Sequence, residues 1–296
     1  MTNLQCIKHA LDYLEKHIEE DIGLKDIAGY VNFSEYHFHR MFKGITDYSL
    51  KDYIRRRRLY LAALDIVNTN ESIAIIAQKY QFSSQASFTV SFGKMHGTTP
   101  GRLRVDQGNY KTFVKMIANE VEMDMPKGLS DPVLVTMDEI LIEGIVTKAK
   151  TSQLKSEDNP ISLIWDRFRS NEVADYAALN DLDTSIIFAI YDYDPRSIFS
   201  NDMQYVYTLG YQSKQKKHKE NPINGPLVKK RISPGGYLKF DLDFSITDHT
   251  EAYDYIDGRW LPKSDYILSE SSDFEMYFMN KGKGNMEIYI SVEDRK

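Results

Sequence analysis

The sequence contains only one cysteine, Cys6, among its 296 residues. A single thiol cannot form an internal disulfide and cannot by itself anchor a thiolate metal site. We expect no metal and no other cofactor. No apolar run approaches the roughly 18 residues of a membrane-spanning helix. The first residues also lack the basic-then-apolar pattern of a signal peptide. We therefore expect a cytoplasmic protein with no membrane partner.

Positive charge is not in excess either, because the net charge is −6. The charges are unevenly distributed, however. Residues 1–107 hold 14 basic and 12 acidic residues, whereas residues 37–111 hold 12 basic and only 5 acidic ones. A local basic stretch on an acidic chain is an electrostatic footprint of nucleic-acid binding that the net charge hides.

What the sequence does have is hydrophobic residues at 42% and charged residues at 27%, a globular balance. At roughly 150 residues per domain, its length predicts two domains. The first hundred residues predict short helices, beginning with an apolar stripe from Leu4 to Ile18 at three- and four-residue steps.

An internal repeat follows this stripe. The pattern Leu24-x-x-Ile27-Ala28-x-x-Val31-x-Phe33-Ser34 recurs 49 residues later as Ile73-x-x-Ile76-Ala77-x-x-Tyr80-x-Phe82-Ser83. It continues as Phe38-x-x-x-Phe42 and, 50 residues later, Phe88-x-x-x-Phe92, so the second copy has one extra residue. Each copy predicts a short helix, a turn, an N-capping serine (Ser34, Ser83) and a second helix, with the phenylalanines in the core. This is the form of a helix-turn-helix unit.

A helix is predicted between the two copies, over residues 49–67, and it contains Arg55-Arg56-Arg57-Arg58. About 17 residues at 1.5 Å each give roughly 25 Å. That length holds two recognition helices close to one DNA turn apart, so one chain would read two successive major grooves. The four arginines are either a solvated helix face or contacts to phosphate, and the sequence leaves both open.

Residues 108–132 predict a linker, because Pro126, Gly128 and Pro132 interrupt regular structure. The domains are then 1–107 and 133–296. Strands are predicted in the second domain at Val133–Met137, Leu141–Thr147, Ser185–Tyr191, Gln204–Tyr211, Tyr237–Phe244, Phe274–Phe278 and Met286–Val292. Helices are predicted near 161–169 and 249–260. The predicted fold is multidomain: an all-α double helix-turn-helix domain, then an α/β (α+β) domain built from two duplicated β-α-β-β halves.

The segment from Phe82-Ser83-Ser84-Gln85 to Gly97-Thr98-Thr99-Pro100, ending Arg102-Leu103-Arg104, resembles the signature of AraC-family transcription regulators. The resemblance covers residues 5–107 and implies sequence-specific binding of double-stranded DNA, an activating role and contact with RNA polymerase. The residues that it places toward DNA are Tyr36, His39 and Arg40 in the first copy and Ser84, Gln85, Ser87 and Thr89 in the second. Arginine suits guanine and glutamine suits adenine. Val90 and Gly93 stand where related regulators carry basic residues, which implies weaker readout by the second copy.

The C-terminal half is similar to the GyrI-like effector-binding domain of Rob-like regulators. The motifs that carry this likeness are Tyr191-Asp192-Tyr193-Asp194-Pro195, Pro234-Gly235-Gly236-Tyr237, Trp260-Leu261-Pro262-x-Ser264-x-Tyr266 and Phe274-Glu275-x-Tyr277. The likeness implies a cleft between the two halves, lined by aromatic residues around a buried acid. A carboxylate among aromatic rings suits a small amphipathic or lipophilic cation as effector. The implied effector-binding residues are Glu275, Tyr277, Tyr237, Trp165, Trp260 and Tyr191.

Two other functions stay open for this half. Some GyrI-like domains are hydrolases of small electrophiles, and Glu275 with Tyr237 or Tyr277 would supply acid–base chemistry. No Ser-His or Cys-His arrangement is visible, so we expect no enzyme and no catalytic residues. The domain would otherwise dock another protein. His37 and His39 are not predicted as metal ligands, because a spacing of two residues splays them apart on a helix.

Overall fold

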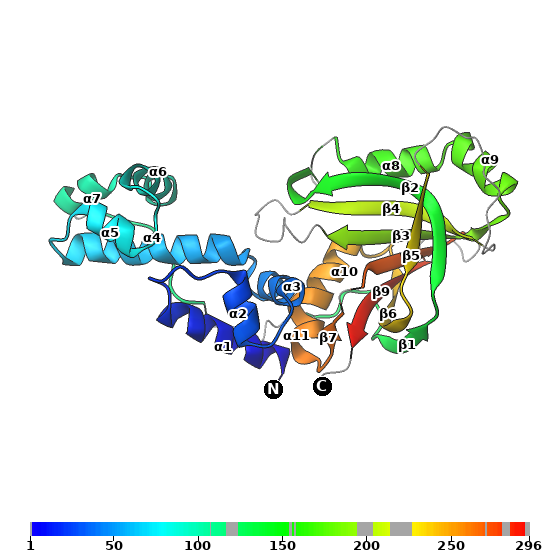
Figure 1. The fold of residues 1–296 in the computed structure, drawn as a ribbon, viewed down its shortest axis with the longest axis horizontal. Helices are drawn as coiled ribbons and strands as arrows, with labels where there is room; N and C mark the ends of the chain where they lie inside the picture. Colours follow the sequence, from blue (N-terminus) through cyan, green and yellow to red (C-terminus); the bar gives the residue numbers. More distant parts are fainter. Residues whose placement is uncertain are drawn as a thin grey trace. The chain divides into compact units, whose positions relative to one another are not determined.

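The structure is a computed structural model of the chain. It describes residues 2–106, 108–116, 124–153, 156, 158–193, 204–213, 227–269, 271–279 and 285–293. The chain divides into two compact units, Met1–Val121 and Glu122–Lys296. The first unit is helical, and the second is a large sheet with helices on it (Figure 1). No helix among the described residues is long and apolar enough to cross a membrane.

Serine caps set where several helices of the first unit begin. The helices of this unit are α1 (Asn3–Lys16), α2 (Leu24–Tyr30), α3 (Glu35–Thr46), α4 (Leu50–Asn68), α5 (Ile73–Lys79), α6 (Gln85–His96) and α7 (Pro100–Asp106). Ser34 caps α3 by accepting from the N–H of His37 at 3.2 Å, as predicted. In the second copy Ser84, not Ser83, caps α6. The extra residue of this copy moves the cap by one position.

Helix α4 supplies core residues to both helix-turn-helix units. In its first half, Tyr53 is fully buried, and its ring meets Phe42 of α3 edge-on with 5.5 Å between centroids. In its second half, Leu59 packs in a cluster with Phe88 and Phe92 of α6. The predicted core role of these phenylalanines is confirmed, and one helix belongs to both units.

Part of the predicted linker packs on the first unit. The N–H of Lys111 donates to Nδ1 of His96 at 3.1 Å, and the carbonyl of Phe113 accepts from Nη1 of Arg57 at 2.7 Å. Farther along, residues 127–130 bond to the strand and turn at 241–247 of the second unit. Several groups of the predicted linker therefore have partners that composition does not reveal, and its bounds of 108–132 stay a prediction.

Among the residues that the structure describes, nine antiparallel strands form the sheet of the second unit. They are β1 (Val133–Met137), β2 (Ile140–Lys150), β3 (Leu182–Tyr193), β4 (Gln204–Ser213), β5 (Leu227–Ile232), β6 (Gly235–Asp243), β7 (Ile267–Leu268), β8 (Asp273–Phe278) and β9 (Asn285–Glu293). Their order is β1-β6-β9-β8-β3-β4-β2-β5, and β7 also pairs with β9. The seven predicted strands are present, whereas the sequence missed β5 and β7.

The strand order reveals the predicted duplication. One half runs β2, the short turn η1 (Thr151–Gln153), α8 (Pro160–Phe168), α9 (Asn171–Leu179), β3, β4. The other runs β6, α10 (His249–Tyr255), the π-helical turn η3 (Ile256–Trp260), α11 (Leu261–Lys263), β8, β9. Of the three strands in each half, the first lies farthest from the centre of the sheet and the second lies nearest, so β3 and β8 meet at the centre. Strands β1 and β5 flank the two halves. Because every pairing is antiparallel, the domain is α+β.

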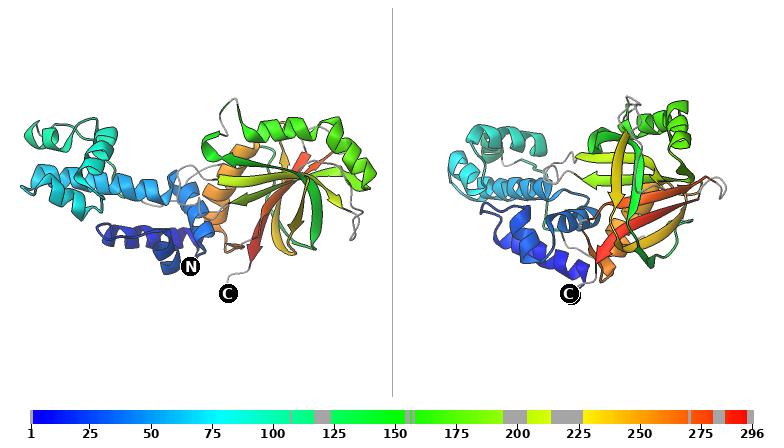
Figure 2. Two further views of the ribbon diagram at one scale, coloured as in Figure 1. Left: turned by 45° about the horizontal axis from the view of Figure 1, so that its top comes forward. Right: turned by 45° about the vertical axis from the view of Figure 1, so that its right-hand side comes forward.

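The sheet coils strongly (Figure 2). Strand β1 lies at one edge and β2 next to the other edge, yet only Asp138 and Glu139 separate them in the chain. Three Cα steps reach at most about 11 Å, so the two edges approach each other. Gly144 of β2 pairs with Gly210 of β4, and a Cβ on Gly144 would lie 1.9 Å from the carbonyl oxygen of Leu209. Only glycine permits that approach.

The coil gives the sheet two different faces. The inner face holds a cluster that includes Phe188, Tyr237 and Phe274. The helix-covered face carries α8, whose Ile164 and Phe168 pack on the strands. Both faces are buried by apolar contacts, so a side chain's strand parity alone decides which cluster it joins.

Candidate functional site

Glu275 lies at the centre of the helix-covered face. It pairs in register with Ala189 of β3 on one side and with Ile288 of β9 on the other. Its side chain is fully buried. Because β3 and β8 are the central strands, the carboxylate stands where the two duplicated halves meet.

Tyrosine hydroxyls surround this carboxylate. Tyr277 donates to Oε2 of Glu275 at 2.8 Å, and the hydroxyl of Tyr191 lies 3.4 and 3.3 Å from its two oxygens. Tyr253 of α10 lies close enough to lower the pKa of Glu275. In the part of the chain that the structure describes, no lysine or arginine forms an ion pair with Glu275. Neutral donors alone therefore bond to this acid.

The protonation of the cluster follows from its burial. Burial raises the pKa of Glu275, and the nearby charge of His249 and the hydroxyls of Tyr277, Tyr253 and Tyr191 offset this only in part. Burial, together with the charge of Glu275, also raises the pKa of Tyr277 and Tyr191 well above the ordinary value. The tyrosines consequently stay protonated and act as donors.

Trp165 of α8 completes the cluster. Its ring meets Tyr277 edge-on with 4.9 Å between centroids, and its Nε1–H donates to the hydroxyl of Tyr207 at 3.0 Å. Tyr207 in turn packs on Tyr191 at 4.8 Å. Four of the predicted effector residues, Glu275, Tyr277, Tyr191 and Trp165, are thus brought together.

Sequence reasoning missed two members of this cluster, Tyr207 and Tyr253. The alternation Tyr205-Val206-Tyr207 in a predicted strand was an available signal, because alternate residues share a sheet face. Nothing in the sequence singles out Tyr253, since its place depends on how α10 packs.

Tyr237 packs apart from Glu275, so its contact with an effector stays a prediction. Tyr237 lies on the inner face, where its ring meets Phe274 edge-on at 5.2 Å and its hydroxyl donates to the carbonyl of Ser233 at 2.8 Å. Phe274 precedes Glu275 in β8, and successive side chains point to opposite faces of a sheet. Tyr237 therefore stabilises the interior of the coil.

Trp260 packs apart from Glu275. Its ring meets Phe240 at 5.6 Å and lies nearly parallel to Tyr266 at 6.3 Å. Phe240 pairs with Ile288, which pairs with Glu275, so two strand spacings separate this packing from the acid. Contact of Trp260 with an effector stays a prediction.

A second buried acid on the helix-covered face, Glu143 of β2, was not predicted. Its Oε2 accepts from the hydroxyl of Tyr176 of α9 at 2.7 Å, and only 2% of the residue is exposed. Burial and this hydrogen bond raise the pKa of Tyr176 to about 12. Glu143 lies three strands from Glu275, which makes it a suitable reference for experiments on the central acid.

Helix α3 carries the first set of residues predicted to contact DNA. At 100° per residue, Tyr36 and Arg40 lie on the side away from Phe38. Arg40 donates to the hydroxyl of Tyr36 at 3.2 Å, and both Arg40 and His39 are buried. Burial lowers the pKa of His39 to about 4, with a contribution from the charge of Lys43, so His39 is neutral at pH 7. Their contact with DNA stays a prediction.

Helix α6 carries the second set. Ser84 and Ser87 cap the helix through reciprocal hydrogen bonds of 3.1 and 3.3 Å, and the hydroxyl of Thr89 donates to the carbonyl of Gln85 at 2.8 Å. The side chain of Gln85 is exposed at the first residue of α6, and Val90 is 59% exposed. Three hydroxyls are thus used within the helix, and Gln85 is the best placed of the four to reach a base.

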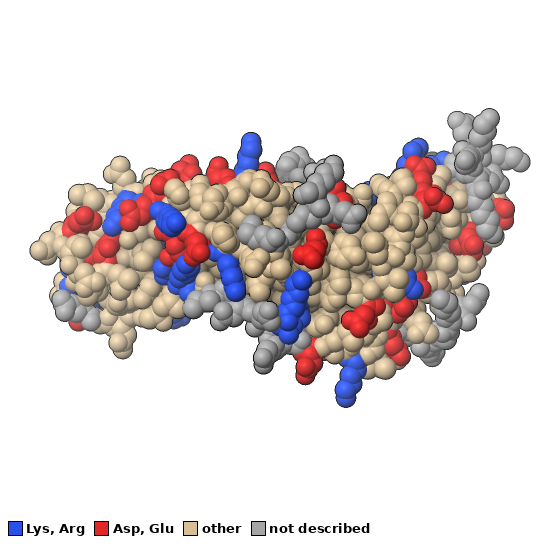
Figure 3. Space-filling view, turned by 90° about the horizontal axis from the view of Figure 1, so that it is seen from below, with Lys and Arg blue, Asp and Glu red and all other residues tan. Residues whose placement is uncertain are grey.

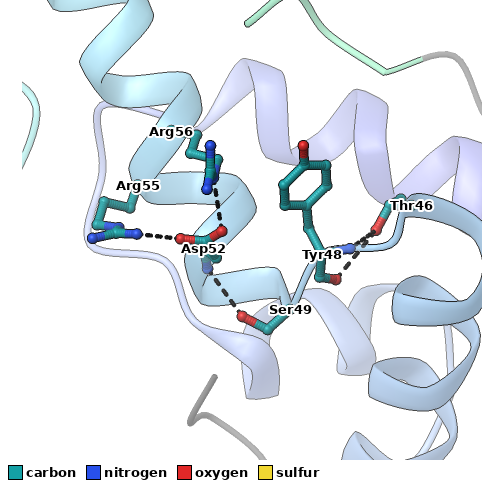
Figure 4. A network of polar contacts seen from close by, with 6 residues as sticks. All are labelled: Thr46, Tyr48, Ser49, Asp52, Arg55 and Arg56. Atoms are coloured by element: carbon teal, nitrogen blue, oxygen red, sulfur yellow. Dashed lines mark hydrogen bonds and ion pairs between the residues drawn. The ribbon is translucent and has the colours of Figure 1, made fainter. Parts of the chain in front are cut away.

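The four arginines of α4 divide into two pairs. Arg57 donates to both carboxylate oxygens of Glu15 at 2.8 and 2.7 Å, and Arg58 donates to carbonyls of the loop after α1. Arg55 and Arg56 instead pair with Asp52 near the N-terminus of α4 (Figure 4). Their side chains are 45% and 39% exposed. Of the run, only this pair is exposed enough for the predicted phosphate contact.

Acidic and basic side chains are interspersed on the face of the first unit seen in Figure 3. Lys115 pairs with Asp12, and Lys79 pairs with Asp65 and Glu19.

The described residues include no group of three or more His, Cys, Asp or Glu placed to hold a metal ion.

Two family models match the chain. The model "Helix-turn-helix domain" matches residues 27–105, and "Integron-associated effector binding protein" matches residues 133–292, more than half of the chain. The HTH-type transcriptional activator AarP of Providencia stuartii is 36% identical over 108 residues, which cover 36% of this chain and 80% of AarP. The chain belongs to the AraC-type helix-turn-helix regulators. Over residues 133–292 this regulator also belongs to the integron-associated effector-binding family.

Other similarities of this AraC-type regulator are partial. The right origin-binding protein of Escherichia coli K12 is 37% identical over 104 residues, covering 35% of the regulator and 36% of that protein. The regulator thus spans about a third of that relative's length. The solved structure of the integron cassette protein VCH_CASS2 from Vibrio cholerae is 16% identical and covers 56% of the regulator and 97% of that chain, with a TM-score of 0.38. Both halves of the predicted resemblance are confirmed by the family models.

Proposed function

We propose that this regulator binds double-stranded DNA through its two helix-turn-helix units, and that a small lipophilic cation bound at Glu275 changes its affinity for DNA. One observation carries the second part: a fully buried carboxylate is bonded by tyrosines and, among the described residues, is paired with no lysine or arginine. A bound cation supplies the opposite charge. The rings of Trp165 and Tyr277 would add about 0.5–2 kcal/mol through cation–π contacts.

The dimensions of the first unit support the DNA part. Helix α4 has 19 residues and is therefore about 28 Å long. In this proposal it holds α3 and α6 close to one turn of DNA apart, so that both would enter successive major grooves from one side of the duplex. Tyr36, His39 and Arg40 contact the first half-site in this proposal, and Gln85 contacts the second.

The regulatory outcome is proposed to be activation. The name of AarP describes that relative as a transcriptional activator. An activator bound beside a promoter would act by contact with RNA polymerase. A reporter gene downstream of the bound site would show higher expression with this regulator than without it, whereas lower expression would indicate repression.

Calorimetry with two ions of the same shape and opposite charge tests the effector site. The full chain is titrated with tetraphenylphosphonium and with tetraphenylborate, and we expect binding of the cation only. Glu275→Gln keeps the shape and removes the charge, so it should weaken cation binding at least tenfold, about 1.4 kcal/mol. Glu143→Gln removes a buried acid three strands away and should leave binding unchanged. Equal affinity of the wild type and Glu275→Gln for the cation would overturn the assignment.

Coupling to DNA is tested on a duplex selected from random sequence by the full-length protein. Fluorescence anisotropy gives the Kd for this duplex with and without saturating tetraphenylphosphonium. We expect the Kd of the wild type to change severalfold and that of Glu275→Gln to stay constant. An unchanged Kd in the wild type would leave a ligand site without a regulatory role.

The geometry weakens the hydrolase alternative. That hypothesis used Glu275 with Tyr237 or Tyr277 as an acid–base pair, and Tyr237 lies on the inner face. In the remaining pair, Tyr277 is a donor whose pKa is raised well above the ordinary value. A neutral phenol of that kind binds and orients a ligand more readily than it transfers a proton at pH 7.

A further inference from the structure

Side chains from α4 and from the turn between α5 and α6 hold the loop that follows α1. Its consecutive carbonyls at Ile18, Glu19 and Glu20 each accept a side-chain hydrogen bond. Arg58 donates to Ile18 through Nε at 2.8 Å and to Glu20 through Nη2 at 2.6 Å. Gln81, in the turn between α5 and α6, donates to the carbonyl of Glu19 at 2.6 Å.

Gln81, which makes this contact, has an unfavourable backbone conformation. Its φ is +59°, in the left-handed region that glycine occupies without penalty and β-carbon-bearing residues adopt at a cost. The residue at the same place in the first copy, 49 positions earlier, is Asn32, with a φ of +56°. Asparagine tolerates this region better than glutamine. Glycine would adopt the backbone conformation of this turn at lower energy, but glycine has no side chain to reach Glu19. An observed backbone outlier of this kind is a reason to look for a function.

An ion-pair network strengthens the same contact. Nζ of Lys79, the last residue of α5, lies 3.4 Å from the carboxylate of Glu19 and 2.9 Å from that of Asp65 on α4. The hydroxyl of Tyr80 also donates to Asp65 at 2.9 Å. The end of α5 is thus fixed both to the loop after α1 and to the shared helix.

We infer that Arg58, Lys79 and Gln81 form a junction with residues 18–20 that locks the two helix-turn-helix units at one separation and one relative rotation. Helix α1 packs on α2 and α3 and so moves with the first helix-turn-helix unit. Gln81, after α5, belongs to the second helix-turn-helix unit.

Bending or twisting of α4 would change the relation of the recognition helices. Residues 111–115 already connect the two helix-turn-helix units beside α4, because Lys111 bonds to His96 and Lys115 pairs with Asp12. The contact of Gln81 with Glu19 adds a further attachment.

The consequence for recognition is a strict spacing between half-sites. Each base pair inserted between them moves the second half-site by 3.4 Å and rotates it by about 34° around the duplex. A locked pair of recognition helices cannot follow that movement. This inference rests on the proposed DNA binding, and it assigns the choice of operator spacing to residues that need not touch DNA.

The test uses the full-length protein and the selected duplex, with one base pair removed or one or two added between the half-sites. We expect each change to weaken binding by the wild type at least tenfold. Gln81→Gly removes the side chain and relieves the backbone cost, so it should fold with an equal or higher Tm. Its loss of affinity on altered spacing should fall below threefold. Gln81→Asn, which tolerates the backbone but is one methylene too short, should behave in the same way.

Asn32→Gly is the matched control. It places glycine in the equivalent turn of the first copy, where the backbone has the same conformation, and should leave the spacing dependence at its wild-type value. Arg58→Ala should relax the dependence as Gln81→Gly does. If the wild type binds no selected duplex, the proposed DNA binding fails. If it binds but tolerates altered spacing, or if Gln81→Gly and Arg58→Ala keep the full dependence, the junction is overturned while DNA binding stands.

Discussion

The hydroxyl of Tyr277 donates to Oε2 of Glu275 at 2.8 Å, from a position two residues along the same strand. Residues i and i+2 of a strand share a face, so this contact is available whenever β8 forms. The bond stabilises the charged acid, whereas burial opposes the charge and raises the pKa of Glu275. The pKa of Glu275 therefore depends on burial against this hydrogen bond, and it sets the pH at which the acid becomes charged.

Cation binding should become stronger as pH rises. In the free protein Glu275 titrates above its ordinary value of 4.5, and only the ionised acid attracts a cation. Binding should therefore release a proton at pH values between 4.5 and the raised pKa. Calorimetry at several pH values, in buffers of different ionisation enthalpy, measures this release. Glu275→Gln should show neither the pH dependence nor the proton release.

The same raised pKa predicts the effect on stability. The folded state holds the proton of Glu275 more tightly than the unfolded state, so the free energy of unfolding decreases as pH rises from 4.5 through the folded pKa. Relative to wild type, Glu275→Gln should thus gain stability with rising pH in this window. Urea unfolding of both proteins across the range checks the sign, and a gain with falling pH would contradict it.

Tryptophan fluorescence should report the effector through one of the two tryptophans. Trp165 packs on Tyr277, which bonds to Glu275, whereas Trp260 packs on Phe240 two strand spacings away. Saturating tetraphenylphosphonium should quench Trp260→Phe, which retains Trp165, and should leave Trp165→Phe nearly unchanged. The reverse pattern would place the ligand beside α11 and η3.

Neighbouring arginines of α4 should differ in their effect on stability. Arg57 is 8% exposed, pairs with Glu15 and donates to the carbonyl of Phe113. Arg57→Ala leaves those groups without their partner and should cost about 3 kcal/mol. Arg55 is 45% exposed, so Arg55→Ala should cost less than about 1 kcal/mol. Chemical denaturation of the full chain, monitored on the helical unit's transition, measures both, and equal costs would contradict this division.

Readout by the second helix-turn-helix unit should depend on Gln85. Gln85→Ala should weaken binding to the selected duplex by about 1–3 kcal/mol and leave binding to scrambled DNA unchanged. Gln78, exposed on α5 outside the recognition helix, provides the control substitution Gln78→Ala. Parallel losses on selected and scrambled DNA would assign Gln85 to the phosphate backbone instead.

Several differences from the sequence predictions have definite physical causes. Strand β5 was missed because it contains Lys229, Lys230 and Arg231, and an edge strand tolerates such charges where a central strand does not. Helix α9 was missed because it depends on packing against β3, and its periodicity is weak. The cap of α6 was predicted at Ser83 because either of two adjacent serines can cap a helix. The extra residue of the second copy places it at Ser84.

The helix-turn-helix repeat, most strands and the duplication of the second domain follow from local sequence patterns, because helical and strand periods, caps and turns act over a few residues. The pattern in the sequence also indicated Glu275 as the central acid. The groups around that acid depend instead on how the chain packs. Tyr191 reaches Glu275 from 84 residues away and Gln81 reaches Glu19 from 62 residues away, and which face Tyr237 occupies depends on strand register. Contacts at such separations are fixed by packing of the whole unit, which no local pattern contains.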